Sequence, residues 1–216
     1  MSRVIPIEKK VVGILLAAGR STRMGGQNKL LADFAGKPIV RHVAVTMLDV
    51  GLDNLIVVTG HQADQVAVTL DQLPVNLVFN PQFSAGQGHS VAAGITAMTE
   101  TATDVVIALG DMPLVSAEIL RTLIGAHLAC VDHQRRITLP SWEGKRGNPV
   151  VWGSAFFSQL KQLRGDFGGR KLLQRHYAAH NSVEFTTSVI FQDIDTPADL
   201  EAVVSKHPES IGPPST

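Results

Sequence analysis

The sequence predicts a three-layer α/β fold, in which helices cover both faces of a mostly parallel sheet. Apolar runs alternate with segments of helical spacing along most of the chain. The first of these runs, residues 11–16, is continuously apolar, as expected for a strand buried on both faces. A chain of 216 residues is also long enough for one large domain with a substantial core.

The first half of the chain predicts strands that alternate with helices. Pro38 suits the first turn of a helix that Gly51 is expected to end, and Ser116 is expected to cap a later one. A small glycine-bearing loop at 84–88 precedes another helix. The predicted strands are 11–16, 55–59, 75–79 and 105–109, and a further helix is predicted from Ala63 to Leu70.

The pattern loosens after about residue 136. Short strands are predicted at 136–140 and 149–152, followed by helices near 154–163 and 170–179. A last strand is predicted at 189–191. Thr196 to Asp199 has the composition of a capped helix start.

Composition limits the class of protein. The 19 basic and 19 acidic residues give a formal net charge of zero, so no general attraction to nucleic acid is expected. No apolar run approaches the roughly 18 residues that a membrane span needs. The polar N-terminus does not resemble a secretory signal, and Cys130 is the only cysteine, so a cytoplasmic protein is predicted. We expect an N-terminal extension at 1–10, one domain at 11–206 and a disordered tail at 207–216.

The loop after the first strand predicts a polyphosphate site. Residues 17–29 contain small side chains, three glycines and the spaced cations Arg23 and Lys29. Small residues let backbone N–H groups surround an anion, and the cations add charge. The loop lacks the P-loop and dinucleotide-binding fingerprints, which disfavours a nicotinamide-dependent reductase. The alternative is an ordinary glycine-rich turn.

Acidic residues follow two of the predicted strands. Asp111 comes directly after a buried strand, behind Gly110, which would allow a ligand to approach closely. Asp193 and Asp195 follow the last predicted strand, where alternate residues point the same way. Mg²⁺ prefers one or two carboxylates together with phosphate oxygens. Equally, Asp111 could be a turn residue that caps its own backbone.

Five motifs together resemble a known family. Residues 16–30 read L-A-A-G-x-S-x-R-M-G-x-x-x-K-L, a loop similar to that of the sugar-phosphate and molybdopterin nucleotidyltransferases. The resemblance is strongest to the molybdenum cofactor cytidylyltransferases and spans about 11–204. The later matching segments, in order, are 110–113, 146–150, 165–170 and 193–197.

The resemblance implies a nucleotide-diphospho-sugar transferase-like, Rossmann-like fold. It also implies Mg²⁺-dependent transfer of CMP from CTP to molybdopterin cofactor, with release of pyrophosphate. Arg23, Lys29 and Asp111 would be catalytic, and Asp111 and Asp195 would hold Mg²⁺. The nucleotide-binding positions would be Leu16, Ala17, Ala18, Gly19, Gly60, Gly86, Gln87 and Gly88, and the acceptor-binding positions Arg146, Asn148 and Arg170.

The chain departs from this branch at three positions. Gln87 and His89 stand where methionine and serines are usual, and Asn148 stands where histidine is usual. These departures bear on the nucleotide contact and, above all, on the identity of the acceptor. Ala18 favours CTP, because the guanylyl-transferring relatives usually have glycine there. Arg146 and Arg170 are either ligands of the acceptor phosphate or plain surface arginines.

The expected chemistry needs no general base, because a phosphate monoester with a second pKa near about 6 is largely dianionic at neutral pH. His176 and His180 are four residues apart on a predicted helix, and we interpret them as a solvated face rather than a metal site. Two alternatives stay open. The chain could transfer another nucleotide to another phosphorylated acceptor, or it could be a non-catalytic module that holds the cofactor for a molybdenum hydroxylase partner.

Overall fold

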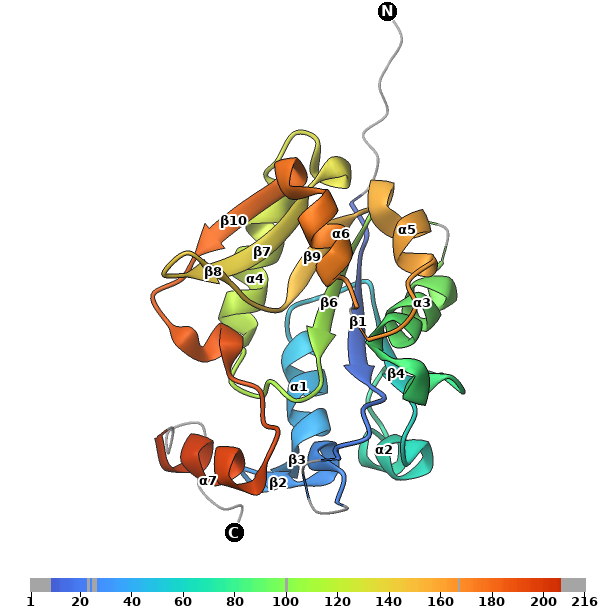
Figure 1. Cartoon of the computed structure of the whole chain (residues 1–216), viewed down its shortest axis with the longest axis vertical. Coiled ribbons are helices and arrows are strands. Elements are labelled where there is room, and N and C mark those ends of the chain that lie inside the picture. Colours follow the sequence, from blue (N-terminus) through green and yellow to red (C-terminus); the bar gives the residue numbers. More distant parts are fainter. Residues whose placement is uncertain (1–8, 23, 25–26, 100, 167, 207–216) are drawn as a thin grey trace, which may run out of the picture.

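The structure, a computed structural model, describes residues 9–22, 24, 27–99, 101–166 and 168–206. In these ranges eight strands form one sheet in the order β10-β7-β9-β6-β1-β4-β5, with β8 paired to β7 (Figure 1). A separate hairpin is formed by β2 and β3. The strands are β1 Val11–Ala17, β2 Asp33–Phe34, β3 Lys37–Pro38, β4 Asn54–Thr59, β5 Asn76–Phe79, β6 Asp104–Leu109, β7 Ile137–Trp142, β8 Lys145–Arg146, β9 Val150–Gly153 and β10 His180–Glu184.

The predicted, mostly parallel sheet is confirmed. Strand β1 lies between β4 and β6, is parallel to both, and is buried along its whole length. Strand β5 extends this parallel group beside β4, and β10 is parallel to β7. Strand β9 is antiparallel to both β6 and β7, so it joins the two parallel groups.

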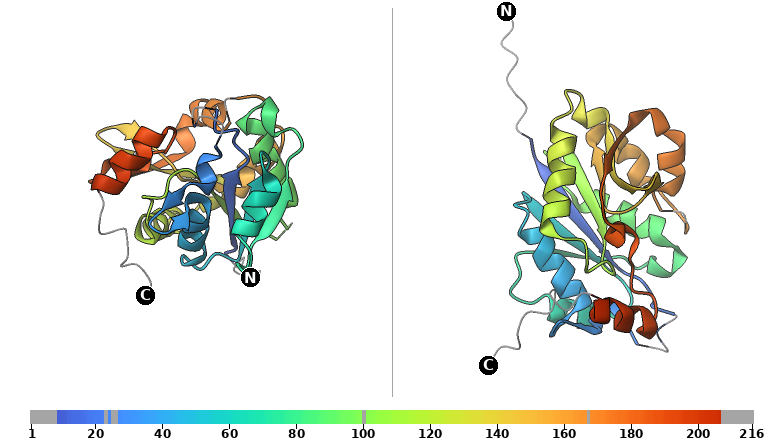
Figure 2. Two further views of the ribbon diagram at one scale, coloured as in Figure 1. Left: turned by 90° about the horizontal axis from the view of Figure 1, so that it is seen from below. Right: turned by 90° about the vertical axis from the view of Figure 1, so that its left-hand side faces the viewer.

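Helices cover both faces of the sheet, as predicted. Leu15 of β1 packs in one core with Met47 of α1 and Leu123 of α4, whereas its neighbour Ile14 packs in a second core with Ile95 of α3. Figure 2 shows α1 and α4 on one side of the sheet and α3 and α5 on the other. The helices are α1 Ile39–Leu48, α2 Ala63–Thr69, α3 Gln87–Ala97, α4 Ala117–Leu128, α5 Phe157–Lys161, α6 Arg170–Arg175 and α7 Pro197–Lys206; the short 3₁₀ helices are η1 Lys29–Leu31, η2 Phe83–Ala85, η3 His133–Arg135, η4 Ser154–Phe156, η5 Tyr177–Ala179 and η6 Ser188–Phe191.

The strand predicted at 189–191 is wrong. This apolar run forms the 3₁₀ helix η6, and Ile190 is fully buried in the core without joining the sheet. The last strand is instead β10, which pairs only with β7 and whose residues are partly or fully exposed. A polar edge strand carries no apolar signal, which is why the sequence did not reveal it.

The helix predicted at 170–179 is also shorter than expected. Helix α6 ends at Arg175, His176 caps it, and His180 begins β10. The two histidines therefore do not share a helix face. His176 instead contacts Gln159, with 2.8 Å between its Nε2 and the Gln159 Oε1.

The C-terminal helix α7 packs against the β2–β3 hairpin through a small apolar cluster that includes Phe34 and Val203 (Figure 1). Its predicted capped start is confirmed. The Thr196 N–H donates to Asp199 Oδ2 at 2.8 Å, and the Asp199 N–H donates to Thr196 Oγ1 at 3.2 Å. The Asp195 N–H also donates to Asp199 Oδ2, at 3.1 Å, so this cap holds the backbone of Asp195.

Residues 1–8 and 207–216, which contain most of the predicted extension and all of the predicted tail, lie outside the described ranges. Within those ranges, no helix is both long and apolar enough to cross a bilayer.

The predicted cap of α4 is confirmed and gives a stability prediction. Ser116 Oγ accepts a hydrogen bond from the Ile119 N–H at 3.3 Å. Because S116A leaves this N–H without its partner, we expect the free energy of unfolding to fall by about 1 kcal/mol in urea denaturation. S205A, at an exposed position inside α7, is the matched control. Equal stability changes in the two variants would contradict a capping role for Ser116.

Candidate active site

A cleft of about 270 Å³ opens where β1 and β6 end. This is the edge of an open α/β sheet at which ligands bind. The first loop forms one wall and the segments after β6 and before α7 form the floor. The lining residues are Leu16, Ala18, Gly19, Arg20, Ser21, Thr22, Lys29, Leu30, Phe83, Gln87, Ser90, Leu109, Asp111 and Asp195.

Lys29 lies between two carboxylates at the bottom of this cleft. Its Nζ is 2.5 Å from Asp111 Oδ2 and 2.6 Å from Asp195 Oδ1. Burial lowers the pKa of Lys29, but the charge of Asp111 and the hydrogen bonds to both carboxylates outweigh it, so the pKa is raised. Lys29 is therefore a cation at neutral pH, and it lies between the two residues that the family resemblance assigns to Mg²⁺.

Two polar side chains hold Lys29 in place. Asn28 caps η1, because its Oδ1 accepts from the Leu30 N–H at 3.1 Å and from the Ser21 hydroxyl at 3.2 Å. Ser21 Oγ accepts in turn from the Lys29 N–H at 3.1 Å. Sequence reasoning missed Asn28, although asparagine before a helix start is a common cap.

Asp111 is positioned by close packing of β6 on β1. The Gly110 N–H donates to the Leu16 carbonyl at 3.0 Å, and a Cβ on Gly110 would lie only 2.9 Å from that oxygen. We expected Gly110 to allow the close approach of a ligand. In the structure, the space beside it is filled by strand β1. The Asp111 carbonyl accepts from the Ile194 N–H at 2.9 Å, which brings the segment of Asp195 to the end of β6.

The three carboxylates fit a divalent cation. Each of three acidic side chains places a carboxylate oxygen within 4.8 Å of the others: Asp111, Asp193 and Asp195. Contrary to the prediction, Asp193 and Asp195 do not follow a strand but lie in the segment between η6 and α7. Partial burial, followed by the charges of Asp111 and Asp195, raises the pKa of Asp193. Asp111 Oδ1 is buried and has no hydrogen-bond partner among the residues that the structure describes. An orphaned carboxylate oxygen beside two further carboxylates is a donor set that suits Mg²⁺ or Mn²⁺.

A second cleft, of about 390 Å³, adjoins the first. It contains the three predicted acceptor-side residues, Arg146 of β8, Asn148 and Arg170 of α6. Asp166 and the buried Trp152 also line it. Leu16, Gln87 and Leu109 line both clefts, so the two meet at the ends of β1 and β6.

Four further predicted residues, Ala17, Gly60, Gly86 and Gly88, line neither cleft. Ala17 is fully buried in the core, and Gly60 packs against Ala18 and Phe83, where a Cβ would lie 2.5 Å from that of Phe83. Gly86 and Gly88 pack on residues 164–166, with the Gly88 N–H donating to the Gly165 carbonyl at 2.8 Å. Arg23 lies outside the described residues.

Three known proteins are similar to this chain. The purine catabolism protein PucB of Bacillus subtilis (strain 168) is 32% identical over 202 residues, which are 89% of this chain and 95% of PucB. The bifunctional protein GlmU of Clavibacter sepedonicus is 37% identical over 125 residues, which are 56% of this chain but only 25% of GlmU. The crystal structure of Rv0371c from Mycobacterium tuberculosis H37Rv in complex with manganese superposes with a TM-score of 0.75 at 25% identity, covering 91% of this chain and 99% of that one.

A protein-family model matches most of the chain. Residues 13–181 match the MobA-like NTP transferase domain, a span that includes the first loop, Lys29, Asp111 and the acceptor-side cleft. The chain belongs to the family of MobA-like NTP transferase domains, and its fold is that of the nucleotidyltransferases.

Proposed function

We propose that this chain transfers CMP from CTP to molybdopterin cofactor and releases pyrophosphate. The observation that carries the proposal is the position of Lys29, which lies between Asp111 and Asp195 beside the junction of two clefts. One cleft has the loop of a nucleotide site and the other has two arginines that suit an acceptor phosphate. The family of the chain supports nucleotidyl transfer as the reaction class.

Asp111 and Asp195, with Asp193 beside them, would hold the divalent ion. When bound, this ion would neutralise phosphate charge and polarise the phosphoryl oxygens. The orphaned Asp111 Oδ1 and the proximity of the three carboxylates support this assignment. The similar structure of Rv0371c was determined with manganese, which supports a divalent ion without selecting Mg²⁺.

The transfer itself needs few groups from the protein. An oxygen of the acceptor phosphate forms a bond to the α-phosphorus of CTP, and the bond from that phosphorus to the bridging oxygen breaks. Pyrophosphate leaves with the electron pair of the broken bond. No proton has to be removed from the nucleophile, because the acceptor phosphate is already largely dianionic at neutral pH. Arg146 and Arg170 would orient the acceptor phosphate, which makes catalysis mostly positioning and charge neutralisation.

Lys29 would take two successive partners. In the structure its ammonium neutralises Asp111 and Asp195. With Asp111 and Asp195 engaged by a divalent ion, the Lys29 ammonium would be available to the β- and γ-phosphates, where charge builds as pyrophosphate departs. Arg20, which also lines the cleft, adds a second described cation on the phosphate side.

A direct test is a pyrophosphate-release screen of CTP, GTP, ATP and UTP against molybdopterin cofactor and other phosphorylated acceptors. The proposal expects release only with acceptor present, and fastest with CTP and molybdopterin cofactor. Activity with another pair would keep the reaction class and replace the substrates. No release with any pair, together with tight cofactor binding, would favour a module that holds the cofactor for a molybdenum hydroxylase in the cytoplasm.

The metal assignment predicts the effect of removing each carboxylate. D111A and D195A should each lower kcat at least about 1000-fold, which corresponds to about 4 kcal/mol of transition-state stabilisation. Both side chains lie at the cleft surface rather than in the core, so thermal melting should change little. D71A, at an exposed position, is the control. Near-normal Mg²⁺-dependent turnover in either variant would remove that residue from the metal site.

The role given to Lys29 predicts an effect on rate rather than on binding. K29M should reduce kcat at least about 100-fold, while the Kd for CTP rises less than about tenfold, because its charge acts mainly on the departing pyrophosphate. Steady-state kinetics and equilibrium dialysis with CTP would separate the two effects. The exposed Lys37 provides the control variant K37M. Equal losses in kcat and in binding would make Lys29 a simple anchor.

The selectivity for the nucleotide base can also be tested. Ala18 lines the nucleotide cleft, and its methyl group occupies space that a glycine would leave open. The wild type should prefer CTP over GTP in kcat/KM, and A18G should reduce that preference by about 10-fold, within the 1–3 kcal/mol typical of such steric differences. A17G adds the same backbone freedom, but its side chain faces the core, so it should leave the ratio unchanged. A wild type that prefers GTP would overturn the choice of CTP.

A further inference from the structure

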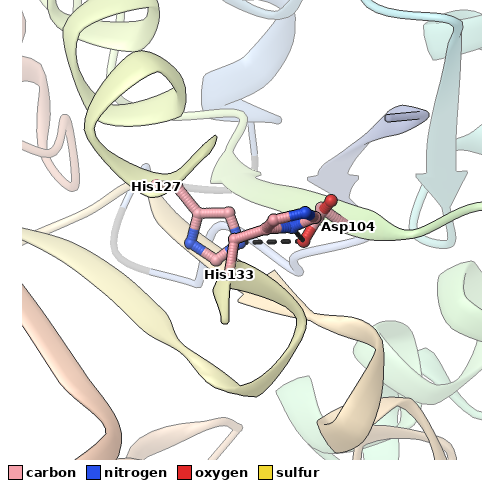
Figure 3. A group of neighbouring side chains, drawn as sticks. All are labelled: Asp104, His127 and His133. Carbon is pink, nitrogen blue, oxygen red and sulfur yellow. Dashed lines mark hydrogen bonds and ion pairs between the residues drawn. The ribbon is translucent and has the colours of Figure 1, made fainter. Parts of the chain in front are cut away.

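A second cluster of titratable side chains lies at the other end of the sheet. Asp104 begins β6, whose far end leads to Asp111, and six residues of strand separate the two sites by roughly 20 Å. His127 from the end of α4 and His133 from η3 point at Asp104 (Figure 3). Nothing in the proposed transfer reaction uses these three residues.

The three side chains converge on one oxygen. His127 Nε2 and His133 Nδ1 each lie 2.9 Å from Asp104 Oδ1, and the ligand atoms of all three residues lie within 4.8 Å of one another. Asp104 and His127 are completely buried, whereas 13% of the His133 side chain is exposed. The cluster is thus closed on the protein side and open to solvent through a single imidazole.

Asp104 and His127 also have an outer contact. Asp104 Oδ2 accepts a hydrogen bond from the Thr103 hydroxyl at 2.7 Å, and the hydrogen bonds from His127, His133 and Thr103 keep the Asp104 pKa lowered despite its burial. His127 Nδ1 is 2.9 Å from Thr138 Oγ1, which is itself held by Asn181 at 3.2 Å. Histidines that bind metals almost always have such a partner on their second ring nitrogen.

The loop that carries His133 is also fixed from outside. It packs against Gly153 of β9, the residue opposite Asp104 in the sheet, so closely that a Cβ on Gly153 would lie 2.3 Å from the Gln134 backbone. The Gly153 N–H donates to the Arg136 carbonyl at 3.0 Å. His133 is therefore placed over Asp104 by the fold, and not by a freely moving loop.

We propose that Asp104, His127 and His133 bind a Zn²⁺ ion, with water completing the coordination. Two imidazoles and one carboxylate suit zinc and related transition metals, whereas Mg²⁺ prefers a set made only of oxygens. If both histidines are neutral, Zn²⁺ binding releases no proton, because each ring proton moves to the nitrogen that does not bind the metal. The His127 proton moves from Nε2 to Nδ1, where Thr138 accepts it, and the His133 proton moves to Nε2 at the surface.

The ion has a structural role in this position. It links the start of β6, the end of α4 and the loop before β7. These links join the half of the sheet at the nucleotide cleft to the half that carries the acceptor cleft. Because Zn²⁺ binds the folded state, a free Zn²⁺ concentration about 100 times Kd should raise Tm by about 5–10 °C.

The experiment titrates metal-free, full-length protein with Zn²⁺ in excess Mg²⁺, so that the carboxylates of the nucleotide cleft are already occupied. Calorimetry should show one Zn²⁺ per chain. H133N should weaken binding more than about 100-fold and abolish the rise in Tm, and T138V should weaken it about 10–100-fold. H42N, which alters a partly buried histidine elsewhere, should bind Zn²⁺ as the wild type does. D111N should also leave Zn²⁺ binding unchanged.

A second readout does not depend on the stability of any variant. ¹⁵N NMR of the histidine rings should show the His127 proton on Nδ1 when Zn²⁺ is bound. The proposal is overturned by a wild type that binds no Zn²⁺ under these conditions. It is equally overturned if D111N, and not H133N, removes Zn²⁺ binding. A His127 proton that stays on Nε2 at saturating Zn²⁺ would also overturn it, because Nε2 would then be hydrogen-bonded to Asp104 and could not bind the metal.

Discussion

One ammonium group connects three parts of the chain that are distant in sequence. Lys29 comes from the first loop, Asp111 from the end of β6 and Asp195 from the segment before α7, and they meet through two short ion pairs. These groups are mostly buried, so the loss of Lys29 would leave two carboxylates without a compensating charge. The site consequently exists only when the loop, the sheet and the C-terminal segment are all in place.

The arrangement of the sheet explains why the two clefts adjoin. Parallel strands β1 and β6 end beside each other, and the side chains of Leu16 and Leu109 face both clefts. On one side the walls come from the parallel half of the sheet, and on the other from the antiparallel strand β9 and helix α6. In the proposed reaction, a nucleotide and an acceptor bound in these clefts would therefore meet where β1 and β6 end.

Much of this arrangement could be predicted from the sequence, for physical reasons that particular elements illustrate. Strands β1, β4 and β6 are buried on both faces, so their continuous apolar runs identified them. The polar edge strand β10 gave no such signal. The apolar run at 189–191 resembles a strand in sequence because its residues pack against the core around the buried Ile190, although their backbone forms a 3₁₀ helix. The cluster of Asp104, His127 and His133 was invisible because tertiary packing, and not any regular spacing, brings these residues together. Ser21 and Asn28 were overlooked because their hydrogen bonds run within an irregular loop.

The cap of α7 connects the surface of the molecule to the candidate active site. Asp199 touches neither cleft, yet its carboxylate accepts the backbone N–H groups of both Asp195 and Thr196. The orientation of Asp195 is thus inherited from a surface helix that rests on the β2–β3 hairpin. If Asp195 holds the metal ion as proposed, proteolytic nicking or unwinding of α7 would release this carboxylate from its position while leaving every cleft side chain chemically intact. The integrity of the last helix would then be a structural precondition for turnover.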